Sequence, residues 1–377
     1  MTITEPIANY IDAHRQEAEN LLVELAQIPA PSNQEKLRAE FCASWLRNQG
    51  AKGVYIDEAW NVIYPIECDN HGEIAVFMAH SDVVFPDTTP LPLSKTDNKI
   101  FCPGVGDDTA NVVALLMAAK YIAQNHLTPR EKGVLLVINS GEEGLGNLKG
   151  SRKIMEDFGG RITEFITFDA SVKQIINRAV GSCRYKIEVT TEGGHSYNKF
   201  GNPNAIAELA SIIHDLYQIQ VPKTGKTTYN VGTISGGTSV NTIAQQACML
   251  YEYRSDEKQA MEIMEAAFRK VISRHQTDGI NISVILIGHR PCTGDVDETQ
   301  LKKLMLRGAK AVKDHFGYNV TYGCGSTDCN IPLSMGIPAI CVGCAEGEGA
   351  HTREEYVNIS SLRPGLGVAF QLVLHHF

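Results

Sequence analysis

The amino-acid sequence predicts an α/β protein: a mixed, mostly parallel sheet flanked by helices, with an α+β domain inserted into it. In the first half of the chain, helix-like segments alternate with short, almost continuously apolar runs, as is typical of strands covered on both faces. From about residue 180 another pattern of strands and helices begins, and the first pattern returns near residue 290. A length of 377 residues also favours more than one domain.

The first half contains three candidate helices and three candidate strands. Helices are predicted where apolar residues recur at three- and four-residue steps: residues 7–26, 35–49 and 111–124. Strands are predicted at short apolar runs: residues 74–79, 133–139 and 165–168. This alternation predicts helices on both faces of a parallel sheet.

The inserted domain is predicted to span residues 180–289. Its elements follow the order strand, helix, two strands, helix, strand: residues 182–190, 205–216, 228–234, 247–254, 257–274 and 281–287. After a turn signal at 291–294, a helix (298–315), a buried strand (339–342) and an apolar tail complete the first domain. We therefore assign residues 1–179 and 290–377 to one discontinuous domain.

Composition argues against several classes of partner. The net charge of −9 leaves no basic excess to neutralise phosphates, so we expect no nucleic-acid binding. The longest apolar runs have the length of a strand and fall short of the roughly 20 residues of a membrane-spanning helix, so no membrane association is expected. The N-terminal segment lacks a basic stretch followed by an apolar one, which favours the cytoplasm.

Ten cysteines are scattered along the chain, mostly among apolar residues. In a reducing compartment such residues usually behave as small hydrophobic side chains. A structural zinc site built from Cys324, Cys329, Cys341 and Cys344 is an alternative, but Cys341 closes an apolar strand-like run and the turns that such a site needs are poorly placed. We therefore favour buried, unmodified thiols.

Acids and imidazoles cluster just beyond the ends of the predicted strands. His80 and Asp82 follow the first strand, Glu142 and Glu143 follow the second, and Asp169 directly follows the third. In open α/β sheets, ligand sites lie outside the carboxyl ends of the strands. Three separate segments therefore bring these groups to one edge, and we expect them to share a site.

Two loops add further candidates. Asp107 and Asp108 stand in a Gly-Val-Gly-Asp-Asp turn before a helix, and His351 follows the Gly-rich segment 346–350. Each residue alone is more often a helix cap or an exposed loop residue. Together, two imidazoles and several carboxylates suit zinc, and a carboxylate that bridges two ions would form a two-metal site that activates water and polarises a carbonyl.

Longer motifs resemble the M20 family of metallopeptidases, which includes peptidase T-like tripeptidases and related deacylases. The motifs occur in the family's order and spacing: AHSDVV, GVGDDTANVVALL, INSGEEGLG, FDAS, GCGSTDCNIPLSMGIPAICVG and AEGEGAHTREEYV. The resemblance implies a catalytic domain that binds two Zn²⁺ ions, with Co²⁺ or Mn²⁺ as alternative metals. It identifies five metal ligands: His80, Asp107, Glu143, Asp169 and His351.

The resemblance also implies a role for each position. His80 and Asp169 would hold one ion, Glu143 and His351 the other, and Asp107 would bridge them. Asp82 would orient His80. Glu142 would act as general base and then as general acid. Where many members have Lys-Gly shortly after the bridging acid, this chain has Asp108, Thr109 and Ala110, which puts only the local turn in doubt.

The inserted domain resembles the family's lid and dimerisation domain. The motif GGHSYNKFGNPNAI implies that His195 stabilises the oxyanion, in its own or the partner subunit's site. The segments GTISGGTSVNTIA and YEYR make Asn241 a candidate contact for a substrate carbonyl and Arg254 a candidate for a substrate carboxylate. An exposed loop histidine, a turn amide and an edge-strand cation are the alternatives for these three residues. We expect a homodimer formed through this domain.

These observations predict a zinc-dependent exopeptidase that acts on short peptides as a tripeptidase, dipeptidase or aminopeptidase. An N-acyl amino acid amidohydrolase with the same metal centre is the nearest alternative. A non-catalytic peptide-binding relative is disfavoured because all five ligands and Glu142 are present.

Overall fold

A computed structural model of the chain describes residues 3–377. The chain forms two units: the first runs to Ala179 and resumes at Gly294, and the second comprises Val180–Thr293. Strand β14 (Ile280–Arg290) continues beyond the predicted domain boundary at 289, and the second division comes after Thr293.

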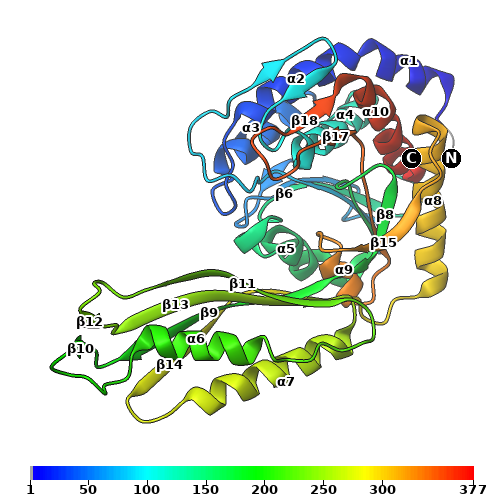
Figure 1. The fold of residues 1–377 in the computed structure, drawn as a ribbon. Coiled ribbons are helices and arrows are strands. Elements are labelled where there is room, and N and C mark those ends of the chain that lie inside the picture. The colour runs from blue at the N-terminus through cyan, green and yellow to red at the C-terminus, as the bar shows by residue number, and fades with distance from the viewer. Residues whose placement is uncertain (1–2) are drawn as a thin grey trace. The chain divides into compact units, whose positions relative to one another are not determined.

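The first unit is built on an eight-stranded sheet (Figure 1). Its strands, in spatial order, are β1 (Tyr55–Ile56), β2 (Val62–Ile66), β6 (Gly133–Asn139), β3 (Ile74–His80), β7 (Ile162–Thr167), β16 (Ala339–Val342), β8 (Gln174–Ala179) and β15 (Thr321–Gly325). Four neighbouring pairs are parallel, namely β6–β3, β3–β7, β7–β16 and β8–β15, and three are antiparallel. The prediction of a mixed, mostly parallel sheet is confirmed.

Helices cover both faces of this sheet because its strands are apolar on both sides. One face packs against α1 (Glu5–Ala13), α2 (Arg15–Gln27), α3 (Lys36–Asn48), α4 (Ala110–Gln124), α8 (Glu298–Phe316) and α10 (Ile359–Val373). The other packs against α5 (Lys149–Phe158) and α9 (Asn330–Ser334). Successive residues of β3 pack into different cores: Phe77 belongs to the first cluster and Met78 to the second.

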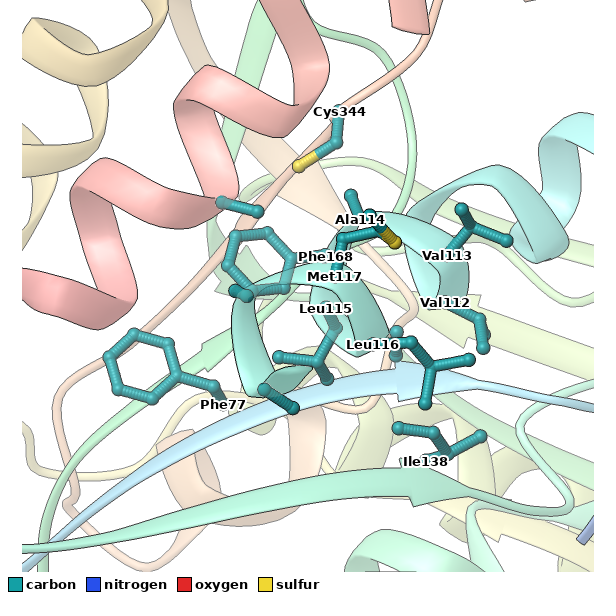
Figure 2. Close-up of a cluster of buried hydrophobic side chains, with 14 of the residues drawn as sticks. Phe77, Val112, Val113, Ala114, Leu115, Leu116, Met117, Ile138, Phe168 and Cys344 are labelled. Atoms are coloured by element: carbon teal, nitrogen blue, oxygen red, sulfur yellow. The ribbon is translucent and has the colours of Figure 1, made fainter. Parts of the chain in front are cut away.

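Helix α4 lies at the centre of the larger core. All its residues from Ala110 to Ala123 except Tyr121 are buried. Figure 2 shows its side chains beside Phe77 and Ile138 of the sheet and Phe168 just after β7. This packing fixes the turn that precedes α4 against the carboxyl ends of the strands.

The helix predicted at 7–26 is divided in the structure. His14 has φ −105° and ψ 10°, and its Nδ1 lies 2.8 Å from the carbonyl oxygen of Tyr10, so a side chain competes with the helical ladder. The helices predicted at 35–49, 111–124 and 298–315 are confirmed within two residues at each end. The predicted apolar tail is the helix α10, followed by the short turn η4 (Leu374–His376).

A small sheet orders two loops at the carboxyl edge. Its strands are β4 (Ser94–Lys95), β5 (Lys99–Phe101), β18 (Tyr356–Asn358) and β17 (Gly347–Glu348). The pairing of β17 with β18 closes the loop that carries His351, and β5 leads into the irregular turn η1 (Val105–Thr109). Two further short turns are η2 (Gly144–Gly146) and η3 (Gly159–Arg161).

The second unit is an antiparallel sheet with two helices. The strand order is β11 (Thr227–Gly236), β13 (Gln246–Ser255), β9 (Gly181–Thr191) and β14. Helices α6 (Ala205–Leu216) and α7 (Lys258–His275) bury its apolar face, and a two-stranded ribbon pairs β10 (Gly194–His195) with β12 (Thr242–Ile243). Within residues 3–377, no helix combines the length and apolar character required to cross a bilayer.

Candidate metal centre

The carboxyl edge of the first unit's sheet carries the predicted ligands. His80 is the last residue of β3, Glu143 lies four residues beyond the end of β6, and Asp169 lies two residues beyond β7. These strands are adjacent and parallel, so their ends meet at one edge (Figure 1).

Asp107 lies between the two predicted histidine ligands. Its Oδ1 is 3.1 Å from His80 Nε2, and its Oδ2 is 3.2 Å from His351 Nε2. Burial raises the pKa of the Asp107 carboxyl, but the hydrogen bonds from the two imidazoles outweigh burial and lower it below its usual value. One carboxylate thus joins two imidazoles from distant parts of the chain.

His80 is held with one ring nitrogen facing the carboxylates. Its Nδ1 lies 3.0 Å from the backbone carbonyl oxygen of Asp82, so Nδ1 carries the hydrogen and Nε2 faces Asp107. Burial lowers the pKa of His80, but the charge of Asp108 and contacts with Asp107 and Asp82 raise it well above its usual value.

Asp82 organises the acids that follow β6. Its fully buried carboxylate accepts hydrogen bonds from the backbone N–H groups of Glu142 and Glu143, each at 2.9 Å, and from the Ser32 hydroxyl at 2.7 Å. The sequence predicted only that Asp82 orients His80. The structure adds that the same side chain fixes the backbone of the adjacent glutamates.

His351 completes the arrangement from an exposed loop. Its Nε2 lies 3.0 Å from Glu143 Oε1, in addition to its contact with Asp107. Its φ of 66° is unusual for a residue other than glycine, and such strain often occurs at functional sites. The hydrogen bonds that His351 donates to Asp107 and Glu143 raise its pKa to about 10, because two carboxylates favour a positive charge at this position.

The structure distinguishes the two adjacent aspartates. Asp108 is fully buried, and its oxygens accept hydrogen bonds from the backbone N–H of His80 and from the Asn111 side chain. Asp107 directs both of its oxygens at the imidazoles instead. These contacts give Asp108 a structural role, and Asp107 is the one of the two whose oxygens both face imidazoles.

Asp169 belongs to a second donor group. Ligand atoms of His80, Asp108 and Asp169 lie within 4.8 Å of one another, as do those of His80, Asp107 and Glu143. Burial and then the charge of Asp107 raise the pKa of Asp169 to about 7. In the part of the chain described, these two groups have the spacing of a metal site, and neither includes a cysteine.

The donor set fits divalent metal ions. Neutral imidazole nitrogens and carboxylate oxygens are the ligands that zinc takes in proteins. Here the carboxylates Asp107, Glu143 and Asp169 converge on two imidazoles, and the raised pKa of His351 indicates that the cluster favours added positive charge. A cation bound to the imidazoles would supply that charge.

Glu355 was not predicted as a site residue. Its buried carboxylate accepts hydrogen bonds from the backbone N–H groups of Gly104, Gly106 and Asp107, at 2.7–2.8 Å. Burial raises the pKa of Glu355 to about 7, although the three N–H groups act in the opposite direction. The Glu-Tyr-Val sequence after His351 was the available signal, but which backbone it would contact is decided only by the fold.

Arg38 is a second residue that sequence reasoning missed. Its guanidinium is fully buried and donates to the carbonyl oxygens of Ile28, Ala26 and Ser81 and to the Thr109 hydroxyl. Burial lowers the pKa of Arg38 to about 10. Because Ser81 follows His80 and Thr109 follows Asp108, Arg38 connects the two segments that carry the predicted ligands His80 and Asp107.

A cavity of about 290 Å³ adjoins the cluster within the first unit. Its lining residues include Asp107 and Asp169, together with Lys173, Glu346 and Glu348. Its volume is that of a small-molecule site, and it lies beside the predicted metal ligands.

Three predicted residues belong to the second unit. His195 and Asn241 lie together at the two-stranded ribbon, where the backbone N–H of Ser196 donates to the carbonyl oxygen of Asn241. His195 Nδ1 accepts from the backbone N–H of Tyr197 at 3.3 Å, which leaves Nε2 as the N–H donor of a neutral ring.

Arg254 lies near the other end of β13 and is already paired. Its Nε and Nη2 contact the two carboxylate oxygens of Glu252 at 2.9 and 3.1 Å. Asn241 and Arg254 therefore do not form one compact subsite within this unit.

Comparison with known proteins covers most of the chain. A family model described as peptidase family M20/M25/M40 matches residues 76–375. A probable carboxypeptidase of Arthroderma gypseum is 24% identical over 259 residues, and this match covers 62% of the chain but only 54% of that protein. An acetylornithine deacetylase of Myxococcus xanthus is 22% identical over 315 residues, 79% of each protein.

Solved structures share the fold. A tripeptidase from Staphylococcus aureus superposes with a TM-score of 0.72 at 21% sequence identity, covering 96% of this chain and 99% of the other. The matched residues therefore include residues of both units.

Proposed function

The chain belongs to peptidase family M20/M25/M40, and on that premise we propose that it is a zinc-dependent exopeptidase that hydrolyses short peptides. One observation carries the proposal: Asp107 lies between the imidazoles of His80 and His351, and Glu143 contacts the second of these imidazoles. A tripeptidase or dipeptidase is the substrate class that we favour, in keeping with the similarity to a tripeptidase.

We assign the centre two Zn²⁺ ions. His80 and Asp169 would hold one ion, Glu143 and His351 the other, and Asp107 would bridge them; Co²⁺ or Mn²⁺ are alternative metals. When bound, the ions act as Lewis acids that acidify water and polarise the carbonyl that is attacked.

Glu142 is the proposed base. Its carboxylate takes a proton from the attacking water and later donates it to the leaving amine. Asp82 supports this role because its carboxylate accepts hydrogen bonds from the backbone N–H groups of Glu142 and Glu143 and so fixes the backbone that carries both side chains. Asp82 is therefore a positioning residue.

The second unit is proposed to act as a lid. The Nε2–H of His195 would stabilise the oxyanion, and the neutral tautomer with Nδ1 accepting from Tyr197 supports that use. Asn241 would contact a substrate carbonyl. Arg254 would bind a substrate carboxylate only by exchanging or sharing its contact with Glu252. We propose that the lid also forms a homodimer, in which His195 serves its own or the partner's site.

Ten free cysteines support a reducing compartment, and we place the enzyme in the cytoplasm. The runner-up function is removal of an acyl group from an amino acid, which the similarity to an acetylornithine deacetylase supports. A non-catalytic peptide-binding protein is a third, weaker reading.

Metal analysis combined with a substrate panel tests the proposal. The purified protein is assayed for bound metal and then for hydrolysis of di- and tripeptides and of N-acyl amino acids. We expect two equivalents of zinc and cleavage of the peptides. Hydrolysis confined to N-acyl amino acids would establish the amidohydrolase instead, and two bound ions without either activity would favour the non-catalytic reading.

A further inference from the structure

The loop that carries His351 is not fixed by apolar packing. Residues 347–354 are all exposed, so burial does not determine where they lie. The φ of His351 is 66°, a conformation that a residue other than glycine keeps only where its surroundings impose it. The position of this imidazole therefore depends on the polar contacts of its loop.

Some of these contacts are local. The pairing of β17 with β18 closes the base of the loop, and the backbone N–H and the hydroxyl of Thr352 donate to the carbonyl oxygen of Gly349 at 2.9 and 2.7 Å. These bonds fix the base and the turn of the loop. They do not connect the loop to the segments that carry the other ligands.

Arg353 makes that connection. Its Nη1 donates to Asp87 Oδ1 at 2.9 Å and its Nη2 to Asp87 Oδ2 at 2.7 Å. Its guanidinium carbon also lies 4.9 Å from the centre of the Phe85 ring. A bidentate pair fixes the direction of the guanidinium as well as its distance, and the aromatic face restrains it from a second side.

This connection has few parallels in the loop. Among the hydrogen bonds and ion pairs of the described residues, those that join 347–354 to segments outside 346–358 belong to Arg353 and to His351. The contacts of His351 are with the predicted ligands Asp107 and Glu143. Arg353 is thus the residue of the loop that holds it from outside the cluster.

The segment that carries Asp87 is itself anchored in the core. Val83, Phe85 and Leu91, on either side of Asp87, are buried in the larger apolar cluster. Moving this segment would expose their side chains to water, which is unfavourable. Arg353 therefore ties an exposed loop to a well-anchored part of the first unit.

We propose that Arg353 is a positioning residue whose pair with Asp87 holds His351 at the metal centre. The inference rests on the proposed two-metal centre, in which His351 is a ligand. The Arg353 side chain is 48% exposed, and such ion pairs contribute little to the stability of a whole fold because solvent screens them. Contacts that orient a metal ligand, however, typically change metal affinity by about 10–100-fold. The effect is thus expected in metal binding rather than in folding.

Zinc titration of the full-length protein in metal buffers tests this role. Arg353→Ala should weaken the binding of one of the two zinc equivalents by about 10-fold and leave the thermal unfolding of the metal-free protein nearly unchanged. The matched control is Arg363→Ala, which breaks a comparable pair with Asp12 at 2.8 and 3.2 Å that joins α10 to α1. This control should bind both equivalents as the wild type does.

Exchanging the two charges tests the pair itself. Asp87→Arg and Arg353→Asp should each weaken zinc binding, because like charges then face each other. The double variant Asp87→Arg/Arg353→Asp should bind zinc more tightly than either single variant, since contacting residues are energetically coupled. Wild-type zinc affinity in Arg353→Ala, or a double variant no tighter than the single ones, would overturn the proposal.

His351→Ala separates this inference from the proposed function. If His351→Ala loses one equivalent of zinc while Arg353→Ala binds both as tightly as the wild type, the metal centre stands and Arg353 does not position its ligand. If His351→Ala keeps both equivalents, the ligand assignment is wrong and the role of Arg353 fails with it.

Discussion

Single carboxylates at the centre act through the backbone as well as through their charge. The Asp82 carboxylate accepts hydrogen bonds from two backbone N–H groups of the 142–143 segment. The Glu355 carboxylate accepts hydrogen bonds from three backbone N–H groups of the 104–107 segment. Hydrogen bonds to a charged acceptor are stronger than neutral ones and are directional. The ligand loops are thus held in place by residues that need not bind metal themselves.

Changing Glu142 and changing Glu143 to glutamine should have different effects on metal content and turnover. Glu142→Gln should keep metal near the wild-type content and lower turnover by roughly 100-fold, because only the proton acceptor is lost. Glu143→Gln should lower the metal content, because Glu143 faces His351. Bound zinc and kcat are measured for both variants. Undiminished turnover in Glu142→Gln would refute its assignment as base.

Glu355→Gln should weaken metal binding without touching a ligand. An amide cannot accept from all three N–H groups of the 104–107 turn, so Asp107 loses its fixed position, and loss of such supporting contacts typically costs about 10–100-fold in affinity. Zinc binding is titrated in metal buffers. Glu354→Gln, an exposed neighbour, is the control. Equal zinc affinity in the two variants would show that Glu355 does not position Asp107.

At the scale of elements, periodicity predicted most helices but failed at the C-terminus. Helix α10 contains Pro364, Gly365 and Gly367, residues that disfavour helices in isolation. Its burial against α4 and α8 offsets that preference. A Cβ built on Gly365 would lie 1.6 Å from the carbonyl oxygen of Cys344, so this glycine permits close packing.

Gly365→Ala should therefore destabilise the protein, although alanine favours helix formation by about 1 kcal/mol. The overlap is with backbone, which cannot move aside as a flexible side chain can, and overpacking typically costs about 1–3 kcal/mol or more. Chemical denaturation measures the change. Gly160→Ala, where a Cβ meets no atom within 4 Å, is the control and should be nearly neutral. Equal stability of the two variants would contradict the packing argument.

At the scale of the whole molecule, the C-terminal segment is tied back to the central sheet. His376 and Arg307 both contact Glu164 of β7. Burial raises the pKa of the Glu164 carboxyl, but the contacts with His376 and Arg307 have a larger effect in the opposite direction. Together they lower this pKa from its usual value of 4.5 to about 2. A carboxyl with a lowered pKa stabilises the folded state above its unfolded pKa, and this contribution is lost as pH falls from about 4.5 to about 2.

Glu164→Gln should consequently cost stability at pH 7 and progressively less between pH 4.5 and 2. A pKa lowered from 4.5 to about 2 corresponds to about 3 kcal/mol at neutral pH. Denaturant midpoints are compared with those of Glu73→Gln, which removes an exposed carboxylate. A difference between the variants that stays constant from pH 7 to pH 3 would contradict the assignment.

The sequence alone predicted the fold class and most of the long elements from local periodicity, and it located acids and imidazoles at strand ends. The choice of five ligands among these residues came from the resemblance to the M20 family. Only the tertiary structure decided which of two adjacent aspartates faces the imidazoles, because Asp108 is engaged by the backbone of a strand 28 residues away in sequence. It likewise revealed Glu355 and Arg38. Their contacts join segments far apart along the chain, and no local pattern encodes which distant backbone a side chain will meet.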